Sequence, residues 1–143
     1  MRYQLSITIH KPIKVVTRLF VNRALLSQWQ PDLLNSQQIE NYPFSKYTHQ
    51  LAIGRRKILI TESIVRHDLP DHYDLKFKLK GITNHTYYSF EEISPDITRM
   101  NCRTEYSFSG IMKLISIFMK GSLKKQSEIL ISNFKQFAES RKG

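Results

Sequence analysis

The sequence predicts an α+β fold: a curved antiparallel sheet of about seven strands that wraps a long C-terminal helix around an apolar, ligand-sized cavity. Three observations indicate this fold. Alternation of apolar and polar residues recurs from Met1 to Phe108, short turns separate the alternating segments, and the period becomes helical after Gly110. The one long helix must therefore cover the apolar face of the sheet.

The N-terminal residues predict one strand followed by two short helices. Residues 1–10 alternate cleanly, as a half-buried strand does. Pro12 suits the first turn of a helix, and apolar spacing continues that helix over residues 13–21. Asn22 is a good N-cap for a second helix that contains Trp29 and ends at Pro31.

Six further strands are predicted in the middle of the chain, over residues 37–41, 47–53, 57–67, 72–80, 83–93 and 97–108. Turns at residues 54–56, 68–71, 81–82 and 94–96 join the last five strands. Turns this short make neighbouring strands antiparallel. The clearest strand sends one set of side chains to the core and the other to water: Tyr73, Leu75, Phe77 and Leu79 inward, and Asp74, Lys76, Lys78 and Lys80 outward.

The C-terminal segment predicts a helix that begins after Gly110, at Ile111, and runs to about Ser140. Its apolar residues fall roughly along one side: Leu114, Ile115, Phe118, Leu123, Leu130, Phe134 and Phe137. Residues 111–119 are apolar nearly all round, which predicts burial on more than one side. Gly121 is a candidate kink in this helix. Phase assigns Leu75, Phe77, Met100, Phe108, Phe118 and Phe134 to the interior.

Length and cysteine content limit the class of protein. A chain of 143 residues fits one domain over residues 1–143. Its one cysteine, Cys102, cannot form an internal disulfide, and the polar–apolar alternation of residues 1–10 does not resemble a signal peptide. No apolar run is long enough for a transmembrane helix, so we expect a cytoplasmic protein.

Charge and motifs narrow the candidate partners. Lys and Arg number 22 against 12 Asp and Glu, a formal net charge of +10 that attracts nucleic acid, acidic lipid headgroups or an anionic small molecule. The five histidines have no metal-binding spacing, and no nucleotide-binding or serine-hydrolase motif occurs. We therefore expect no metal and no cofactor. A monomer and a homodimer are both consistent with the sequence.

Four segments, in their order and spacing, resemble the START-like superfamily, also labelled SRPBCC. They are residues 7–16, a strand, a proline and a helix; residues 26–31, with the tryptophan that closes the second short helix; residues 61–65 with 68–70, a strand and a proline turn; and residues 130–139, the end of the long helix. The resemblance implies a helix-grip fold with a cavity. Because the superfamily includes polyketide cyclases, lipid-transfer domains and pollen-allergen-type hormone binders, it does not imply one reaction.

The candidate ligand-binding residues are the polar and adaptable side chains expected to face the cavity: His49, Glu62, Phe77, Tyr88, Met100, Cys102, Tyr106, Phe118, Met119 and Ser122. A buried imidazole beside a buried carboxylate is a candidate acid–base pair. A bulge would instead turn Glu62 outward, or the pair is structural. Tyr88 and Tyr106 either hydrogen-bond a ligand or are core rings, and Cys102 is either pocket wall or core.

Three functions agree with these observations. The leading hypothesis is binding of a hydrophobic or amphipathic small molecule such as a lipid, an isoprenoid or a polyketide-like aromatic. An alternative is a cyclase, dehydratase or hydrolase that uses the same cavity. A third is a basic interaction module for a protein, a nucleic acid or an anionic membrane.

Overall fold

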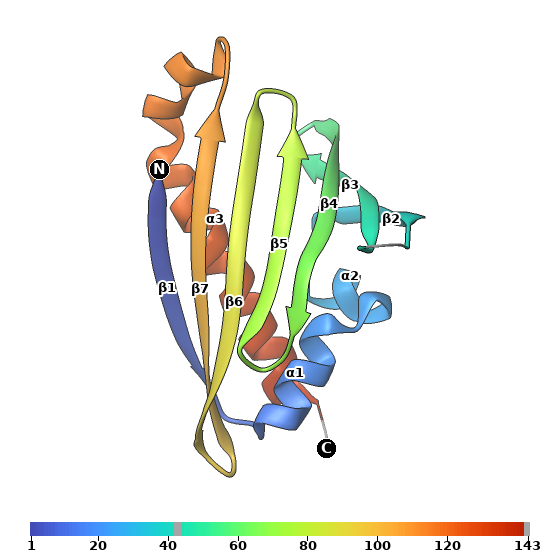
Figure 1. Ribbon diagram of the computed structural model, residues 1–143, viewed down its shortest axis with the longest axis vertical. Coiled ribbons are helices and arrows are strands. Elements are labelled where there is room, and N and C mark those ends of the chain that lie inside the picture. The colour runs from blue at the N-terminus through green and yellow to red at the C-terminus, as the bar shows by residue number, and fades with distance from the viewer. Residues whose placement is uncertain (42–43, 142–143) are drawn as a thin grey trace.

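The computed structural model describes residues 1–41 and 44–141 of the chain. Its seven strands form one antiparallel sheet in the order β1-β7-β6-β5-β4-β3-β2 (Figure 1). The strands are β1 (Arg2–Ile9), β2 (Leu33–Glu40), β3 (Lys46–Ile53), β4 (Arg56–Asp68), β5 (His72–Leu79), β6 (Ile82–Ser94) and β7 (Ile97–Phe108). The helices are α1 (Ile13–Val21), a 3-10 turn (Arg23–Leu25), α2 (Leu26–Trp29) and α3 (Met112–Ser140). The predicted fold class is confirmed.

Local signals placed most element boundaries within a few residues. The predicted α1 and β7 match the observed bounds, and the Asn22 side chain accepts a hydrogen bond from the backbone N–H of Ala24 at 3.0 Å, as its role of N-cap requires. Strand β2 is the exception, because it begins four residues before the predicted start at Gln37. Pairing with β3, beginning at Leu33 opposite Leu51, extends it through a polar stretch that shows no alternation.

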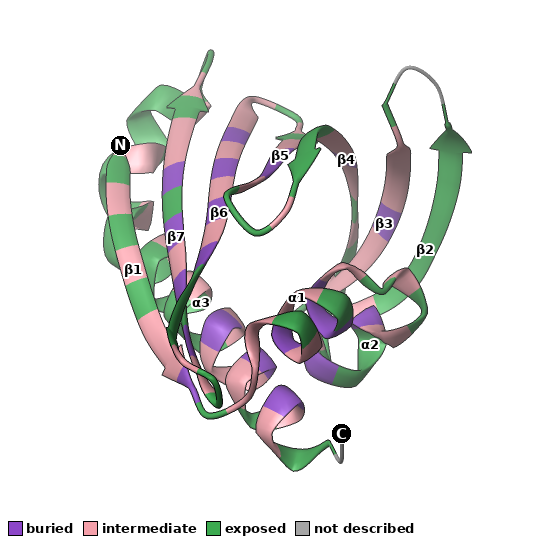
Figure 2. Cartoon of the chain, turned by 60° about the horizontal axis from the view of Figure 1, so that its bottom comes forward, coloured by how far each residue is buried: buried purple, intermediate pink, exposed green. Residues whose placement is uncertain are grey.

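The core lies at one end of the sheet, where α1, α2 and the last turns of α3 cover its concave face (Figures 1 and 2). Phe20 of α1 is central to this core. Its ring lies 4.7 Å from that of Tyr88, 4.9 Å from Phe134 and 5.4 Å from Trp29, all centroid to centroid. These edge-to-face and stacked contacts tie helices from both halves of the chain to the middle of the sheet.

The first turns of α3 are exposed, so the predicted burial of residues 111–119 is wrong. Ile111 is 72% exposed and Phe118 is 86% exposed, and Leu114 and Ile117 are similarly open. Among the described residues no element covers the outer side of these turns, so apolar composition alone does not bury them. Phe118 is thus a surface residue, contrary to prediction, and α3 continues through Gly121 without a break.

Candidate ligand-binding cavity

The concave face of the sheet and α3 enclose a cavity of about 650 Å³ above the core. Most of its wall is aliphatic or aromatic, with Leu51, Ile58, Ile60, Leu75, Phe77, Leu79, Leu123 and Leu130 among the lining side chains. This volume lies within the range of small-molecule sites, about 300–1,000 Å³. The space can therefore hold the apolar body of a ligand.

The alternation of β3 and β4 turns two ionisable residues into this cavity. Ile58, Ile60 and Glu62 share the inward phase of β4, and His49 lies opposite Ile60 on β3. The irregularity of β4 falls between Ile64 and Arg66, beyond Glu62. The bulge that would have turned the carboxylate outward therefore acts too late in the strand to do so.

Arg23, His49 and Glu62 form a buried ionic cluster at the cavity wall. The Nε2 atom of His49 lies 3.0 Å from Oε2 of Glu62, and the Arg23 guanidinium forms an ion pair with Oε1 of the same carboxylate. The guanidinium also donates to the Tyr73 hydroxyl at 3.0 Å and lies 4.3 Å from the centroid of the Tyr47 ring. Each charge in this cluster therefore has a partner, as burial requires.

The cluster holds Glu62 in its charged form. Burial raises the pKa of Glu62, but the hydrogen bond from His49 and the charge of Arg23 outweigh burial, so the net pKa lies below the usual value. Burial lowers the pKa of Arg23, and the carboxylate of Glu62 more than reverses that change. The lowered pKa of Glu62 and the raised pKa of Arg23 both indicate that the pair is a carboxylate with a guanidinium.

His49 carries a hydrogen-bonding atom that the chain does not use. A carboxylate only accepts hydrogen bonds, so Nε2 of His49 is the protonated nitrogen that faces Glu62. Its Nδ1 atom is buried and has no hydrogen-bond partner among the described residues. In the neutral imidazole this nitrogen is an acceptor, in a side chain that lines the cavity. A ligand hydroxyl is a suitable partner.

A second polar group, on β6 and β7, is satisfied internally. Thr86 donates to Oδ1 of Asn84 at 2.6 Å, and the Asn84 side-chain amide donates to the Thr104 hydroxyl at 2.6 Å.

Burial raises the pKa of both Tyr88 and Tyr106, so each keeps its phenolic proton. Burial also raises the pKa of Cys102 to about 12, and its thiol is therefore not activated.

The structure brings together most of the predicted site residues. The cavity is lined by His49, Glu62, Phe77, Tyr88, Cys102, Tyr106, Met119 and Ser122, and ligand contact by each stays a prediction. Met100 is buried in the core but is not among the lining residues. Phe118 points to the surface because it lies about 100° around the helix from Met119, which faces the cavity.

The polar residues of the cavity wall that sequence reasoning missed include Arg23, Asn84 and Thr86. The last two share the inward phase of Tyr88 on β6, so polar residues in the inward phase of a strand were an available signal. For Arg23 no local signal existed, because it belongs to the 3-10 turn and reaches Glu62 across 39 positions of sequence.

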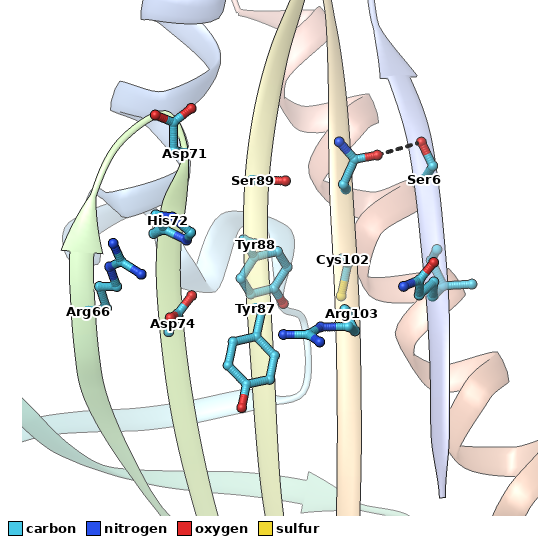
Figure 3. Close-up of a pocket in the computed structure, with 13 residues that line it drawn as sticks. Ser6, Arg66, Asp71, His72, Asp74, Tyr87, Tyr88, Ser89, Cys102 and Arg103 are labelled. Carbon is cyan, nitrogen blue, oxygen red and sulfur yellow. Dashed lines mark hydrogen bonds between the residues drawn. The ribbon is translucent and has the colours of Figure 1, made fainter.

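The convex face of the sheet carries a separate polar hollow of about 700 Å³ (Figure 3). Arg66, His72, Asp74 and Arg103 are among its lining residues. Asp74, predicted to face water, is only 9% exposed. Its Oδ1 atom has no hydrogen-bond partner within residues 1–41 and 44–141. Few aliphatic side chains line the hollow, whereas most of the cavity wall is aliphatic or aromatic.

Within the described part of the chain, no cluster of three His, Cys, Asp or Glu side chains is arranged to hold a metal ion. The same residues contain no helix that is long and apolar enough to span a membrane. No protein-family model matches the chain, and no curated protein matches it in sequence.

Solved structures do match, over nearly the whole chain. An aromatase/cyclase, Zhui of a Streptomyces species, superposes with a TM-score of 0.84 at 8% identity, covering 99% of this chain and 94% of its own. A protein of Thermus thermophilus, TTHA0849, gives 0.79 at 11% identity and 98% coverage of both chains. A START superfamily protein of Mycobacterium smegmatis gives 0.71 at 11% identity, covering 95% and 98%. Identities this low show the fold alone: the chain has the helix-grip fold of START-like proteins, as its sequence motifs predicted.

Proposed function

We propose that this chain binds an amphipathic small molecule whose apolar body fills the cavity and whose hydroxyl group donates a hydrogen bond to Nδ1 of His49. The observation that carries this proposal is a buried, unpartnered nitrogen of the His49 imidazole, a side chain that lines an apolar cavity of about 650 Å³. Burial of apolar surface supplies most of the affinity, and the polar anchor fixes the orientation of the ligand.

The ionic cluster prepares this anchor before the ligand arrives. Glu62 accepts the Nε2 hydrogen of His49 and so holds both the tautomer and the ring plane, while Arg23 holds the carboxylate. A fixed acceptor loses little conformational entropy when the ligand binds.

Calorimetry with matched probes tests the anchor. We expect 2-naphthol to bind more tightly than naphthalene by about twofold to tenfold, since one net hydrogen bond contributes about 0.5–1.5 kcal/mol. His49→Leu should abolish this preference while both probes still bind. Equal affinity of the two probes for the unmodified protein would contradict the anchor.

A matched pair of tryptophan variants tests the cavity. Ser122 lines the cavity and is exposed on α3, so Ser122→Trp should fill the entrance and weaken probe binding at least about tenfold. Gln136→Trp adds the same side chain to an exposed α3 position outside the cavity and should leave binding unchanged. Native mass spectrometry of the purified protein should also show a co-purified apolar molecule, and this signal should be weaker for Ser122→Trp.

The same His49–Glu62 couple favours a second candidate function, acid–base catalysis on a bound substrate. An imidazole oriented by a carboxylate is an arrangement that general bases use. Among the solved structures of similar fold is an aromatase/cyclase. Bound ligand that His49→Gln converts more slowly, at unchanged affinity, would favour catalysis, and ligand recovered chemically unchanged from the native protein would favour binding.

A further inference from the structure

The start of α3 presents an exposed apolar surface that is not packed into the core. We define the α3 tip as residues 111–118, where Ile111, Leu114, Ile115, Ile117 and Phe118 are all exposed. Large aliphatic and aromatic side chains grouped in this way mark an interaction site, whereas isolated ones do not.

Three segments distant in sequence lie at this end of the molecule (Figure 1). Strand register places the β5–β6 turn beside the end of β7, since Ile82 pairs with both Leu79 and Phe108. The backbone N–H of Ser109 donates to the carbonyl of Gly81 at 2.9 Å, which ties the start of α3 to that turn. Thr61 pairs with Lys78, so the β3–β4 turn lies at the same end.

The charge of these segments has one sign. Residues 53–57, 78–82 and 109–125 contain no Asp or Glu and carry nine exposed cationic side chains: Arg55, Arg56, Lys57, Lys78, Lys80, Lys113, Lys120, Lys124 and Lys125. The strand ends and turns at the opposite end contain the acidic residues Asp68, Asp71, Glu91, Glu92 and Asp96, and cations such as Lys14 and Arg66 lie there too. The net charge of +10 is therefore strongly polarised toward the α3 tip.

We propose that this end of the molecule docks on an anionic lipid bilayer, with the α3 tip inserted at the interface and the surrounding lysines and arginines on the headgroups. A helical surface that combines exposed aliphatic and aromatic residues with cations and lacks acids has the chemistry of interfacial membrane binding. A second copy of the chain is a poor partner, because pairing these ends would bring two uniformly positive surfaces together. Nucleic acid would satisfy the charges but leave the aliphatic side chains in water.

Part of the cavity rim lies at the docking end, and other exposed lining residues, Pro31, Asp32, Gln126 and Ile129, lie outside the three basic segments. Ile53 and Ser122 line the cavity and are exposed, the first at the β3–β4 turn and the second one turn beyond the α3 tip. Docking would therefore place this part of the rim against the bilayer, a consequence that rests on the proposed ligand-binding function. The docking itself needs no ligand and is tested without one.

Vesicle sedimentation tests the docking on the unmodified protein. We expect it to pellet with phosphatidylglycerol vesicles at low salt, to pellet several-fold less in 0.5 M salt, and to stay in solution with phosphatidylcholine vesicles. No binding to phosphatidylglycerol at low salt would overturn the proposal.

Matched double variants test the insertion of the apolar tip. Ile117→Ser with Phe118→Ser should weaken vesicle binding at least about tenfold. Ile39→Ser with Ile93→Ser removes two exposed apolar side chains elsewhere on the sheet and should leave binding unchanged. Equal losses of vesicle binding in the two double variants would overturn the proposal. It would also be overturned if the protein self-associates through residues 117 and 118 in sedimentation analysis and does not bind vesicles.

Charge reversal tests the cationic rim. Lys120→Glu should weaken binding about fivefold or more, whereas Lys14→Glu, on the exposed side of α1 at the far end, should have little effect. Binding that depends on Lys120 but not on Ile117 and Phe118 would indicate adsorption by charge alone and would overturn the insertion.

Discussion

The two ends of α3 are built from similar residues and lie in opposite environments. Phe134, near the C-terminal end, is fully buried, with its ring 4.9 Å from Phe20 and 5.1 Å from Trp29. Phe118, near the N-terminal end, is 86% exposed. The difference comes from what each end meets, because α1 and α2 cover the sheet only beside the last turns of the helix.

This contrast separates stability from function along a single helix. The closed end contains the aromatic core that holds the sheet, the short helices and α3 together. The open end contributes little burial and leaves space over the sheet. Core packing is sensitive to single substitutions, whereas an exposed surface is free to serve recognition.

Paired phenylalanine truncations should give the largest contrast. Phe134→Ala should lower the free energy of unfolding by about 3–5 kcal/mol, because it removes a ring from the close-packed core. Phe118→Ala should change it by less than about 0.5 kcal/mol. Urea unfolding followed by circular dichroism measures both, and comparable losses would show that the two ends of α3 contribute equally to stability.

The ionic cluster between the two ends should give the next effect. Glu62→Gln should lower the free energy of unfolding at neutral pH by about 1.5–3 kcal/mol, since it removes buried hydrogen bonds to a charged group. The exposed Glu40→Gln is the matched control.

The contribution of Glu62 should also depend on pH. Its pKa is lower in the folded than in the unfolded chain, so its stabilisation is complete above the usual value of 4.5 and is lost as the pH falls through the folded value. Unfolding curves at acidic pH should show this loss in the unmodified protein, whereas the Glu62→Gln variant should lack this component. Parallel curves for the two proteins would contradict the lowered pKa.

Two glycines at the open end should show a smaller difference. Both Gly54 and Gly81 have positive φ, so alanine should cost about 1–2 kcal/mol at either position. A Cβ at Gly81 would also lie 2.6 Å from Cγ of Met112, whereas one at Gly54 meets nothing within 4 Å. Gly81→Ala should therefore be the more destabilising variant in thermal unfolding. Equal effects would show that the Met112 side chain moves aside at little cost in free energy.

The last prediction concerns the reactivity of the Cys102 thiol in the unmodified protein. Cys102 faces the cavity with its pKa raised to about 12, so at pH 8 it should react with a disulfide reagent roughly 1,000-fold more slowly in the folded than in the unfolded protein. Absorbance of the released thiol measures both rates. Rapid labelling of the folded protein would contradict a buried, protonated thiol.

Sequence reasoning predicted the fold closely and the candidate site in part. Strand alternation put His49 and Glu62 in the inward phase, and the helical period put Met119 on the cavity side. It missed Arg23 because a residue in an irregular turn has no phase. It misplaced Phe118 because hydrophobicity measures the tendency of a side chain to be buried and does not supply the partner that buries it.

The sequence by itself determined the order of elements, most of their boundaries, the antiparallel pairing and the excess of positive charge, because these follow from local periodicity, turn chemistry and composition. Only the tertiary structure decided which end of α3 is covered, that Arg23 reaches Glu62, and that three separate basic segments lie at the same end of the molecule. These features depend on sheet curvature and on contacts between residues far apart in the chain, which no local pattern encodes.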